Sequence, residues 1–215
     1  MKNKLILGIV IMFTMAMGEG CVSTKSYVDP SFGKTAYEDL KRPAKPFKWR
    51  VVVEFQRHGN HLPQADSELR GHVERVLRAS GVGVPTQDKE APELLVVVNN
   101  FGDTGSAAAK GVGTGLTFGL VGNTVTDMYE MTFLLSGKGQ TTHQKKYSHA
   151  LRTAIGNESL PSGVEPMTPS AAFGVVVEQM LLKALKEFEE SGVLSSLLFD
   201  DLFDLLGISR STIFG

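Results

Sequence analysis

The chain has 215 residues, of which 42% are hydrophobic, and a formal net charge of -1. This length and composition predict one modest folded domain with appendages, and the near-neutral charge gives no reason to expect nucleic acid as a partner. The sequence contains a single cysteine, which excludes an intrachain disulfide.

The N-terminus has the pattern of an export signal. Lys2 and Lys4 supply positive charge, and an apolar stretch follows at residues 5–17. This stretch is too short for a membrane-spanning helix but has the length of a signal-peptide core. We therefore expect the first residues to be removed from the exported protein.

The end of this signal resembles the lipidation signal of bacterial lipoproteins. Gly20 stands directly before Cys21. The resemblance implies a lipoprotein signal peptide over residues 1–20 and acyl chains, palmitate among them, on Cys21. A cut after Gly18 is the alternative, because Ala16 and Gly18 fit the rule of small residues at a signal-peptide cleavage site.

The next segment, residues 21–48, has the composition of a tether. It contains Pro30, Pro43 and Pro46, and it sustains neither a strand nor a helix periodicity. We expect it to link the lipid anchor to the folded domain.

Residues 49–192 have the patterns of one α+β domain. The run WRVVVEFQ at 49–56 is rich in β-branched and aromatic residues and predicts a strand. An amphipathic helix follows, for which Asp66 or Ser67 is the expected N-cap and Gly81 the expected C-cap.

The rest of the domain contains further strand patterns and a second helix. The strands are expected at residues 82–84, as a short edge strand, and at 94–100, 128–136 and 141–154. Thr168 is the expected N-cap of the second helix, Pro169 its first residue, and Gly192 its end. These elements predict a mostly antiparallel sheet of about four strands with two helices on one face.

A Gly-rich apolar insertion, residues 105–127, separates two of these strands. Small residues recur at every fourth position, which places them on one helix face where a second helix can approach closely. These positions are Ala107, Gly111, Gly115 and Gly119, with Gly122 close by. We interpret them as a membrane or oligomer packing face, a glycine zipper; a buried or flexible Gly-rich loop is the alternative.

The tail, residues 193–215, has the pattern of an amphipathic helix. Leucine and phenylalanine side chains make a wide apolar surface, opposite Ser196, Asp200 and Asp204. We expect this appendage either to dock on its own domain or to bind a partner or second subunit.

The sequence gives little support for an enzyme. It has no G-x-S-x-G elbow, H-E-x-x-H, Walker or Rossmann fingerprint. His58 and His61 lie near Asp66, and His143 and His149 share a strand, but no third ligand stands at the tight spacing of a metal site. We therefore expect no catalytic residues, no metal and no cofactor.

In the order of its elements the domain resembles the TraT family of outer-membrane lipoproteins. The resemblance covers about residues 48–190 and is carried by the strand 51–55 with its helix, the strand 94–100, and the run GLTFGLVG at 115–122 followed by Asp127 and Tyr129. TraT proteins are linked with surface exclusion in conjugation and with complement resistance. The resemblance implies a non-enzymatic protein that is lipid-anchored in the outer membrane and self-associates.

The same order of strands and helices also resembles other envelope lipoproteins. These include LptE, a lipopolysaccharide-assembly partner, and CsgG, the curli secretion pore. The alternative expectation is therefore a periplasmic assembly or secretion accessory that binds another envelope protein, because fold alone does not decide function.

Overall fold

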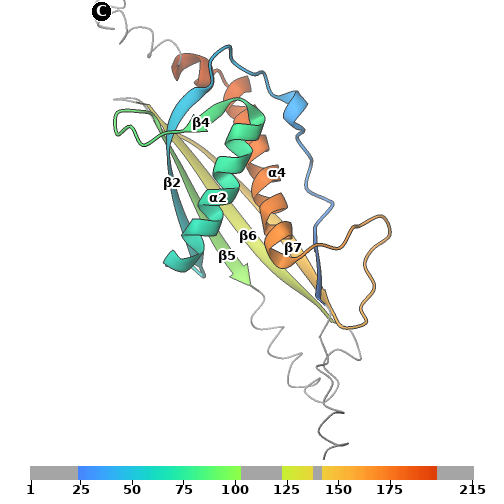
Figure 1. Ribbon diagram of the computed structural model, residues 1–215. Coiled ribbons are helices and arrows are strands. Elements are labelled where there is room, and N and C mark those ends of the chain that lie inside the picture. The colour runs from blue at the N-terminus through green and yellow to red at the C-terminus, as the bar shows by residue number, and fades with distance from the viewer. Residues whose placement is uncertain (1–23, 103–122, 138–141, 198–215) are drawn as a thin grey trace, which may run out of the picture.

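The structure is a computed structural model that describes residues 24–102, 123–137 and 142–197 (Figure 1). The elements are β1 (Thr24–Val28), the 3-10 helix η1 (Tyr37–Asp39), β2 (Phe47–Arg57), β3 (Asn60–His61), α2 (Pro63–Ser80), β4 (Gly83–Pro85), β5 (Glu93–Gly102), β6 (Asn123–Ser136), β7 (His143–Ile155) and α4 (Pro169–Glu190). Within this part of the chain, no helix is long and apolar enough to cross a membrane.

Seven strands form the sheet in the described part of the chain, in the order β1-β7-β6-β5-β2-β3, with β4 beside β2. The pairs of β2 with β4 and β5 are parallel and the other pairs are antiparallel. The predicted α+β class is confirmed, but the predicted number of about four strands is wrong. The additional strands are short, and two residues such as those of β3 are too few to give an alternating pattern.

Both long helices lie on the same side of the sheet (Figure 1). The core lies between these helices and the alternate strand residues that face them. It includes Leu69, Val73, Val76 and Leu77 of α2, Val177, Leu181, Leu185 and Phe188 of α4, and Trp49, Val96, Met131 and Phe133 of the sheet, all buried. The apolar residues on one face of each helix and on one face of the sheet are therefore buried together in a single core.

The helix ends confirm two predicted caps and correct a third. Thr168 caps α4, since its hydroxyl oxygen accepts from the Ala171 N–H at 3.2 Å. Gly81 ends α2 in the left-handed conformation, with φ 70°. The prediction that Asp66 or Ser67 caps α2 is wrong, because this helix already begins at Pro63.

Instead of capping the helix, Asp66 binds the outer edge of β2. Its Oδ1 accepts from the Phe55 N–H at 2.7 Å, and Arg70 of the same helix donates to the Val51 carbonyl at 2.6 Å. Unpaired strand edges invite pairing with other chains. The two side chains of α2 therefore occupy main-chain groups that β3 and β4 leave free.

Residues 24–48, which the sequence placed in a tether, contribute to the fold. β1 pairs with β7, and on its other side Ser26 and Met167 exchange backbone hydrogen bonds of 2.9 and 2.8 Å. Leu40 and Phe47 are buried. The prolines of this segment lie outside its strands, so they do not interrupt the pairing.

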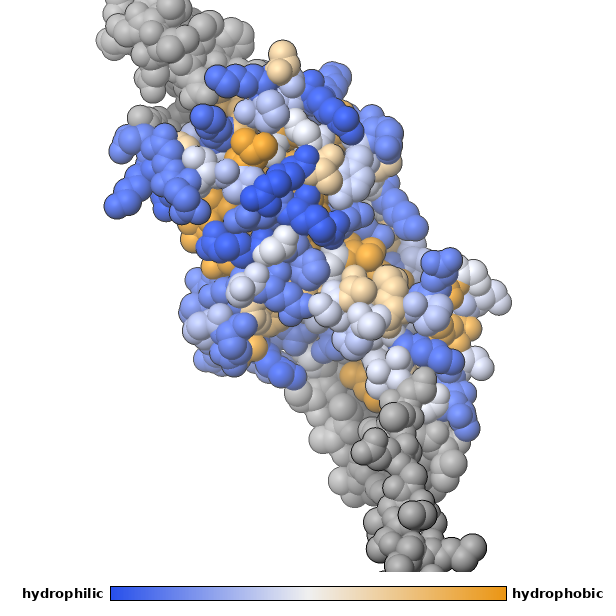
Figure 2. All heavy atoms as spheres, viewed as in Figure 1, coloured by the Kyte–Doolittle hydropathy of each residue, from blue (hydrophilic) through white to orange (hydrophobic). Residues whose placement is uncertain are grey.

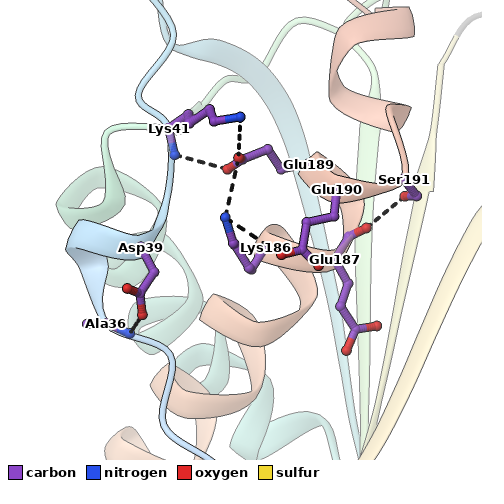
Figure 3. A network of polar contacts seen from close by, with 8 residues as sticks. All are labelled: Ala36, Asp39, Lys41, Lys186, Glu187, Glu189, Glu190 and Ser191. Atoms are coloured by element: carbon purple, nitrogen blue, oxygen red, sulfur yellow. Dashed lines mark hydrogen bonds and ion pairs between the residues drawn. The ribbon is translucent and has the colours of Figure 1, made fainter.

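Polar contacts hold the same segment to the end of α4 (Figure 3). Glu189 accepts from the Lys41 backbone N–H at 2.9 Å, and its carboxylate also lies 3.7 Å from the Lys41 ammonium and 3.5 Å from that of Lys186. Closer to β1, the Phe32 ring stacks on His149 with ring centroids 4.3 Å apart. The segment is therefore packed along α4.

Two other predicted boundaries differ in the structure. Residues 123–127, which the sequence assigned to the Gly-rich insertion, are the first residues of β6. The tail continues as a helix over 193–197, and Val193, Leu194 and Leu197 are buried in the core. The beginning of the predicted appendage therefore docks on its own domain.

An ion pair at the end of β1 predicts a pH-dependent contribution to stability. Hydrogen bonds from the backbone and hydroxyl of Ser31, and then the Arg152 guanidinium 2.8 Å away, lower the pKa of Asp29 from 3.8 to about 2. A carboxyl group whose pKa is lower in the folded than in the unfolded protein stabilises the fold at pH values above its unfolded-state pKa. This stabilisation is lost as the pH falls through the folded-state pKa. We expect Asp29→Asn to lower the melting temperature at neutral pH, with the difference from wild type shrinking between pH 3.8 and about 2.

Circular dichroism melts over this pH range would test the expectation. Asp88→Asn is the matched control. The Asp88 carboxylate also accepts a backbone hydrogen bond, from the Glu90 N–H two residues further on, but it lies in an exposed loop. A difference between Asp29→Asn and wild type that stays constant down to pH 2 would contradict the assignment.

Candidate functional site

The points where residues 1–23 and residues 103–122 join the described fold lie at one end of the sheet (Figure 1). Thr24, the first described residue, and Asn123, the first residue of β6, pair with Ile155 from its two sides. Neighbouring strands are about 4.8 Å apart, so these two positions lie roughly 10 Å from each other. Gly102, the last residue before the internal segment, pairs with Asp127 at the same end.

Exposed hydrophobic side chains mark this same end. Phe101 is 43% exposed and Met128 is 41% exposed. Among the described residues, these two are the large hydrophobic side chains that are exposed to solvent. They are cross-strand partners on the face of the sheet opposite the helices. On the helix side, strongly hydrophilic residues cover most of the surface, with small hydrophobic patches between them (Figure 2).

A pocket of about 430 Å³ opens on the helix side of the same end. The C-terminal ends of β2 and β5, the neighbouring part of β6 and the first turns of both long helices enclose it. Its lining comprises Phe55, Arg57, Asn100, Asp127 and Tyr129 from the sheet, Leu62, Ala65 and Glu68 from the α2 region, and Pro169, Ser170 and Phe173 from α4. A volume of this size is within the range of small-molecule sites.

Aromatic rings form one wall of the pocket. The Phe173 ring centroid lies 5.2 Å from that of Tyr129 and 5.8 Å from that of Phe55. Phe55 and Tyr129 face the helices because they follow the alternation of β2 and β6, and Phe173 stands one turn into α4. The aromatic wall therefore follows from the alternation of side chains along the strands and from the helical spacing along α4, which also place the core residues.

Charged and polar groups meet at the strand ends. A Cβ placed on Gly102 would lie 3.1 Å from Asp127 Oδ1, 3.3 Å from Asn100 Oδ1 and 3.8 Å from Arg57 Nη2, so all three side chains approach one point. Asn100 is only 5% exposed, and its amide nitrogen donates to Asp127 Oδ1 over a long 3.5 Å. Within the described residues, Arg57 forms no ion pair with a carboxylate.

The phenol in this group stays protonated at neutral pH. Burial raises the pKa of Tyr129 well above its ordinary value, and the negative charges of Asp127 and Glu68 raise it further. The nearby Arg57 and a hydrogen bond with Asn100 oppose this shift. Tyr129 can therefore donate its hydroxyl proton to a bound group.

Glu68 joins the two helices at the mouth of the pocket. The Ser170 hydroxyl donates to Glu68 Oε1, and His72 Nε2 lies 3.7 Å from the same oxygen, too far for a hydrogen bond. Burial is the largest influence on His72 and lowers the pKa of its imidazole. Glu68 thus places a carboxylate at the mouth beside a largely neutral histidine.

The sequence-predicted site residues fall into two groups. Cys21 and the packing face of Ala107, Gly111, Gly115, Gly119 and Gly122 lie outside the described residues. The histidines are described: His61 Nε2 lies 2.8 Å from Asp66 Oδ2, and the buried His149 lies 2.7 Å from Gln179 Oε1. No cluster of three or more potential metal ligands occurs in the portion of the chain that the structure covers.

Sequence reasoning missed the pocket. Its polar groups come from different strands, and none of them stands in a sequence motif that marks a binding site. One signal was present: Asn99 and Asn100 follow the apolar run of a strand, and a few polar groups placed beside apolar side chains are typical of binding sites.

Comparison with known proteins gives structural similarities of low score. No protein-family model matches the sequence, and no curated protein matches it. A PelC dodecamer from Paraburkholderia phytofirmans, a single-substitution variant, has 15% identity over 75% of this chain and 95% of that one, with a TM-score of 0.35. Rare lipoprotein B from Shewanella oneidensis has 15% identity over 71% and 98%, with a TM-score of 0.34.

A minor lipoprotein from Acinetobacter baumannii is a third similar structure. It has 11% identity over 72% of this chain and 95% of that one, with a TM-score of 0.34. The second and third of these structures are thus bacterial lipoproteins. At TM-scores this low, the similarities carry no argument about this protein's function.

Proposed function

We propose that the protein is a non-enzymatic lipoprotein anchored in the bacterial outer membrane through acyl chains on Cys21. One observation carries the proposal. The segments that contain Cys21 and the Gly-rich residues join the fold at the same end of the sheet, and Phe101 and Met128 are exposed there. This end would face the bilayer.

The short distance between the anchor and the fold supports this orientation. Cys21 precedes Thr24 by three residues, which span at most roughly 10 Å when fully extended. The first strand therefore holds the domain close to the lipid, without the long tether that the sequence suggested. Stable anchoring needs more than one acyl chain or a second membrane contact, which Phe101 and Met128 could supply.

Self-association through the Gly-rich segment, as the TraT resemblance implies, is the second part of the proposal. Ala107, Gly111, Gly115 and Gly119 keep a four-residue spacing that allows close helix contact. Surface exclusion of the TraT kind is the function that this arrangement supports best. An envelope-assembly accessory would instead need a second protein in fixed ratio.

The anchor is tested by labelling and fractionation. Wild type should incorporate radiolabelled palmitate and sediment with membranes, and Cys21→Ala should lose the label and most of the membrane association. Phe101→Ser/Met128→Ser should weaken association further in the Cys21→Ala background. Its matched control is Leu95→Ser/Leu134→Ser, another cross-strand pair on the same face but away from this end.

Tight membrane association of Cys21→Ala with both exposed residues replaced would contradict the anchoring proposal.

Oligomerisation is tested by the mass of the detergent-extracted complex, which Gly115→Leu should reduce. A homo-oligomer supports the TraT-like function. A second protein at fixed stoichiometry would favour the assembly accessory.

A further inference from the structure

We infer that the pocket between the first turns of α2 and α4 binds a zwitterionic phosphoethanolamine group, either as the headgroup of a phospholipid or as the free compound. The inference deepens the proposed function and rests on it only for placing this end beside a bilayer. The pocket itself is defined by described residues alone.

The negatively charged part of such a ligand has a suitable partner in Arg57. A guanidinium binds phosphate oxygens with paired hydrogen bonds, and Arg57 has no carboxylate partner among the described residues. Leu62 and Pro169 place the N-termini of both long helices at the same pocket. Helix N-termini carry partial positive charge and favour anions, so they reinforce Arg57.

The positively charged part has partners on the other side of the pocket. Asp127 receives only the long 3.5 Å bond from Asn100 among the described side-chain contacts, so its carboxylate can accept from an ammonium group. Glu68 adds a second carboxylate, and the faces of Tyr129 and Phe173 can attract a cation. A primary ammonium donates hydrogen bonds to carboxylates, whereas a choline group cannot.

The close approach of opposite charges favours a zwitterion over a simple anion. Asp127 Oδ1 and Arg57 Nη2 lie within 4 Å of one point yet do not pair directly. A free anion at Arg57 would be repelled by Asp127, and a free amine at Asp127 would be repelled by Arg57. A group that carries both charges satisfies both residues.

Isothermal titration of the full-length protein in detergent tests the inference. Phosphoethanolamine should bind at least tenfold more tightly than inorganic phosphate or phosphocholine. Arg57→Gln and Asp127→Asn should each weaken this binding at least tenfold. Arg78→Gln and Glu74→Gln, which remove one charge each from an exposed pair on α2, should leave it unchanged.

Three results would overturn the inference: no binding to wild type, equal binding of phosphate and phosphoethanolamine, or binding that Asp127→Asn leaves intact. Circular dichroism of each variant checks that the fold is retained. Tighter binding of a short-chain phosphatidylethanolamine than of phosphoethanolamine would identify the lipid as the source, and equal binding the free compound. If the proposed lipid anchor is wrong, the Cys21→Ala fractionation will show it, and the titration results for the pocket will not change.

Discussion

Trp49→Ala should lower the free energy of unfolding by about 3–5 kcal/mol, the usual range for removing a buried aromatic side chain. Trp49 is fully buried, and its ring stacks on Phe47 with centroids 5.5 Å apart and planes 8° from parallel. Gly83 of β4 packs directly on this ring, since a Cβ there would lie 2.7 Å from it. The substitution would therefore leave a cavity over Gly83 of β4, where the ring now packs. Urea unfolding followed by circular dichroism measures the loss.

Trp49→Phe is the matched variant. The indole N–H of Trp49 is buried without a hydrogen-bond partner in the described part of the chain. Phenylalanine retains an aromatic ring and removes this unsatisfied donor, whose burial costs about 1–3 kcal/mol. The phenylalanine variant should therefore lose much less stability than the alanine variant. Equal losses would show that the position does not depend on ring packing.

Gly174→Ala should destabilise the protein by about 1 kcal/mol or more, although alanine is the better helix former. Gly174 lies inside α4 where this helix meets α2. A Cβ at this position would lie 2.7 Å from His72 Cε1 and 2.8 Å from His72 Nδ1. The His72 ring also packs on Phe173, with centroids 5.6 Å apart, so it cannot move without loss of contact. The melting temperature and urea midpoint report the effect.

Gly71→Ala is the control for this prediction. Gly71 lies in the interior of α2, and a Cβ there would meet nothing within 4 Å. It should therefore show the helix propensity alone and stabilise the protein by about 0.5–1 kcal/mol. In the double variant His72→Ala/Gly174→Ala, the new methyl group has room, so the second substitution should cost less than it does alone. Equal effects at Gly71 and Gly174 would contradict close packing of the helices.

The main elements could be predicted from sequence because burial imposes a period on them. The β-branched runs at 49–56 and 94–100, and the four-residue spacings of Leu69 with Val73 in α2 and of Phe173 with Val177 in α4, belong to elements whose buried residues face the core. Elements held by partners far along the chain left no such pattern. β1 has five residues, and its place depends on β7 and on Met167.

The pocket could not be predicted for the same kind of reason. Arg57, Asn100 and Asp127 approach one point because β2, β5 and β6 are neighbours with a particular register. Asp66 has the sequence context of a helix cap, yet it binds a strand edge because Pro63 starts the helix earlier. Sequence-local rules allow several structural roles for one side chain. The register of strand pairing determines which residues it contacts.

The pairing of β1 with β7 also sets an order of events during synthesis. Ser26 bonds Thr153, 127 positions further along the chain, with their hydroxyl oxygens 2.8 Å apart. A chain made from its N-terminus has no partner strand for residues 24–28 until residues 143–155 exist, and closing so long a loop carries an entropic cost. Residues 24–28 therefore have no strand partner while the intervening chain is being made, which would leave the proposed lipidation site at Cys21 accessible to processing enzymes. They become part of the sheet only when the last strand arrives.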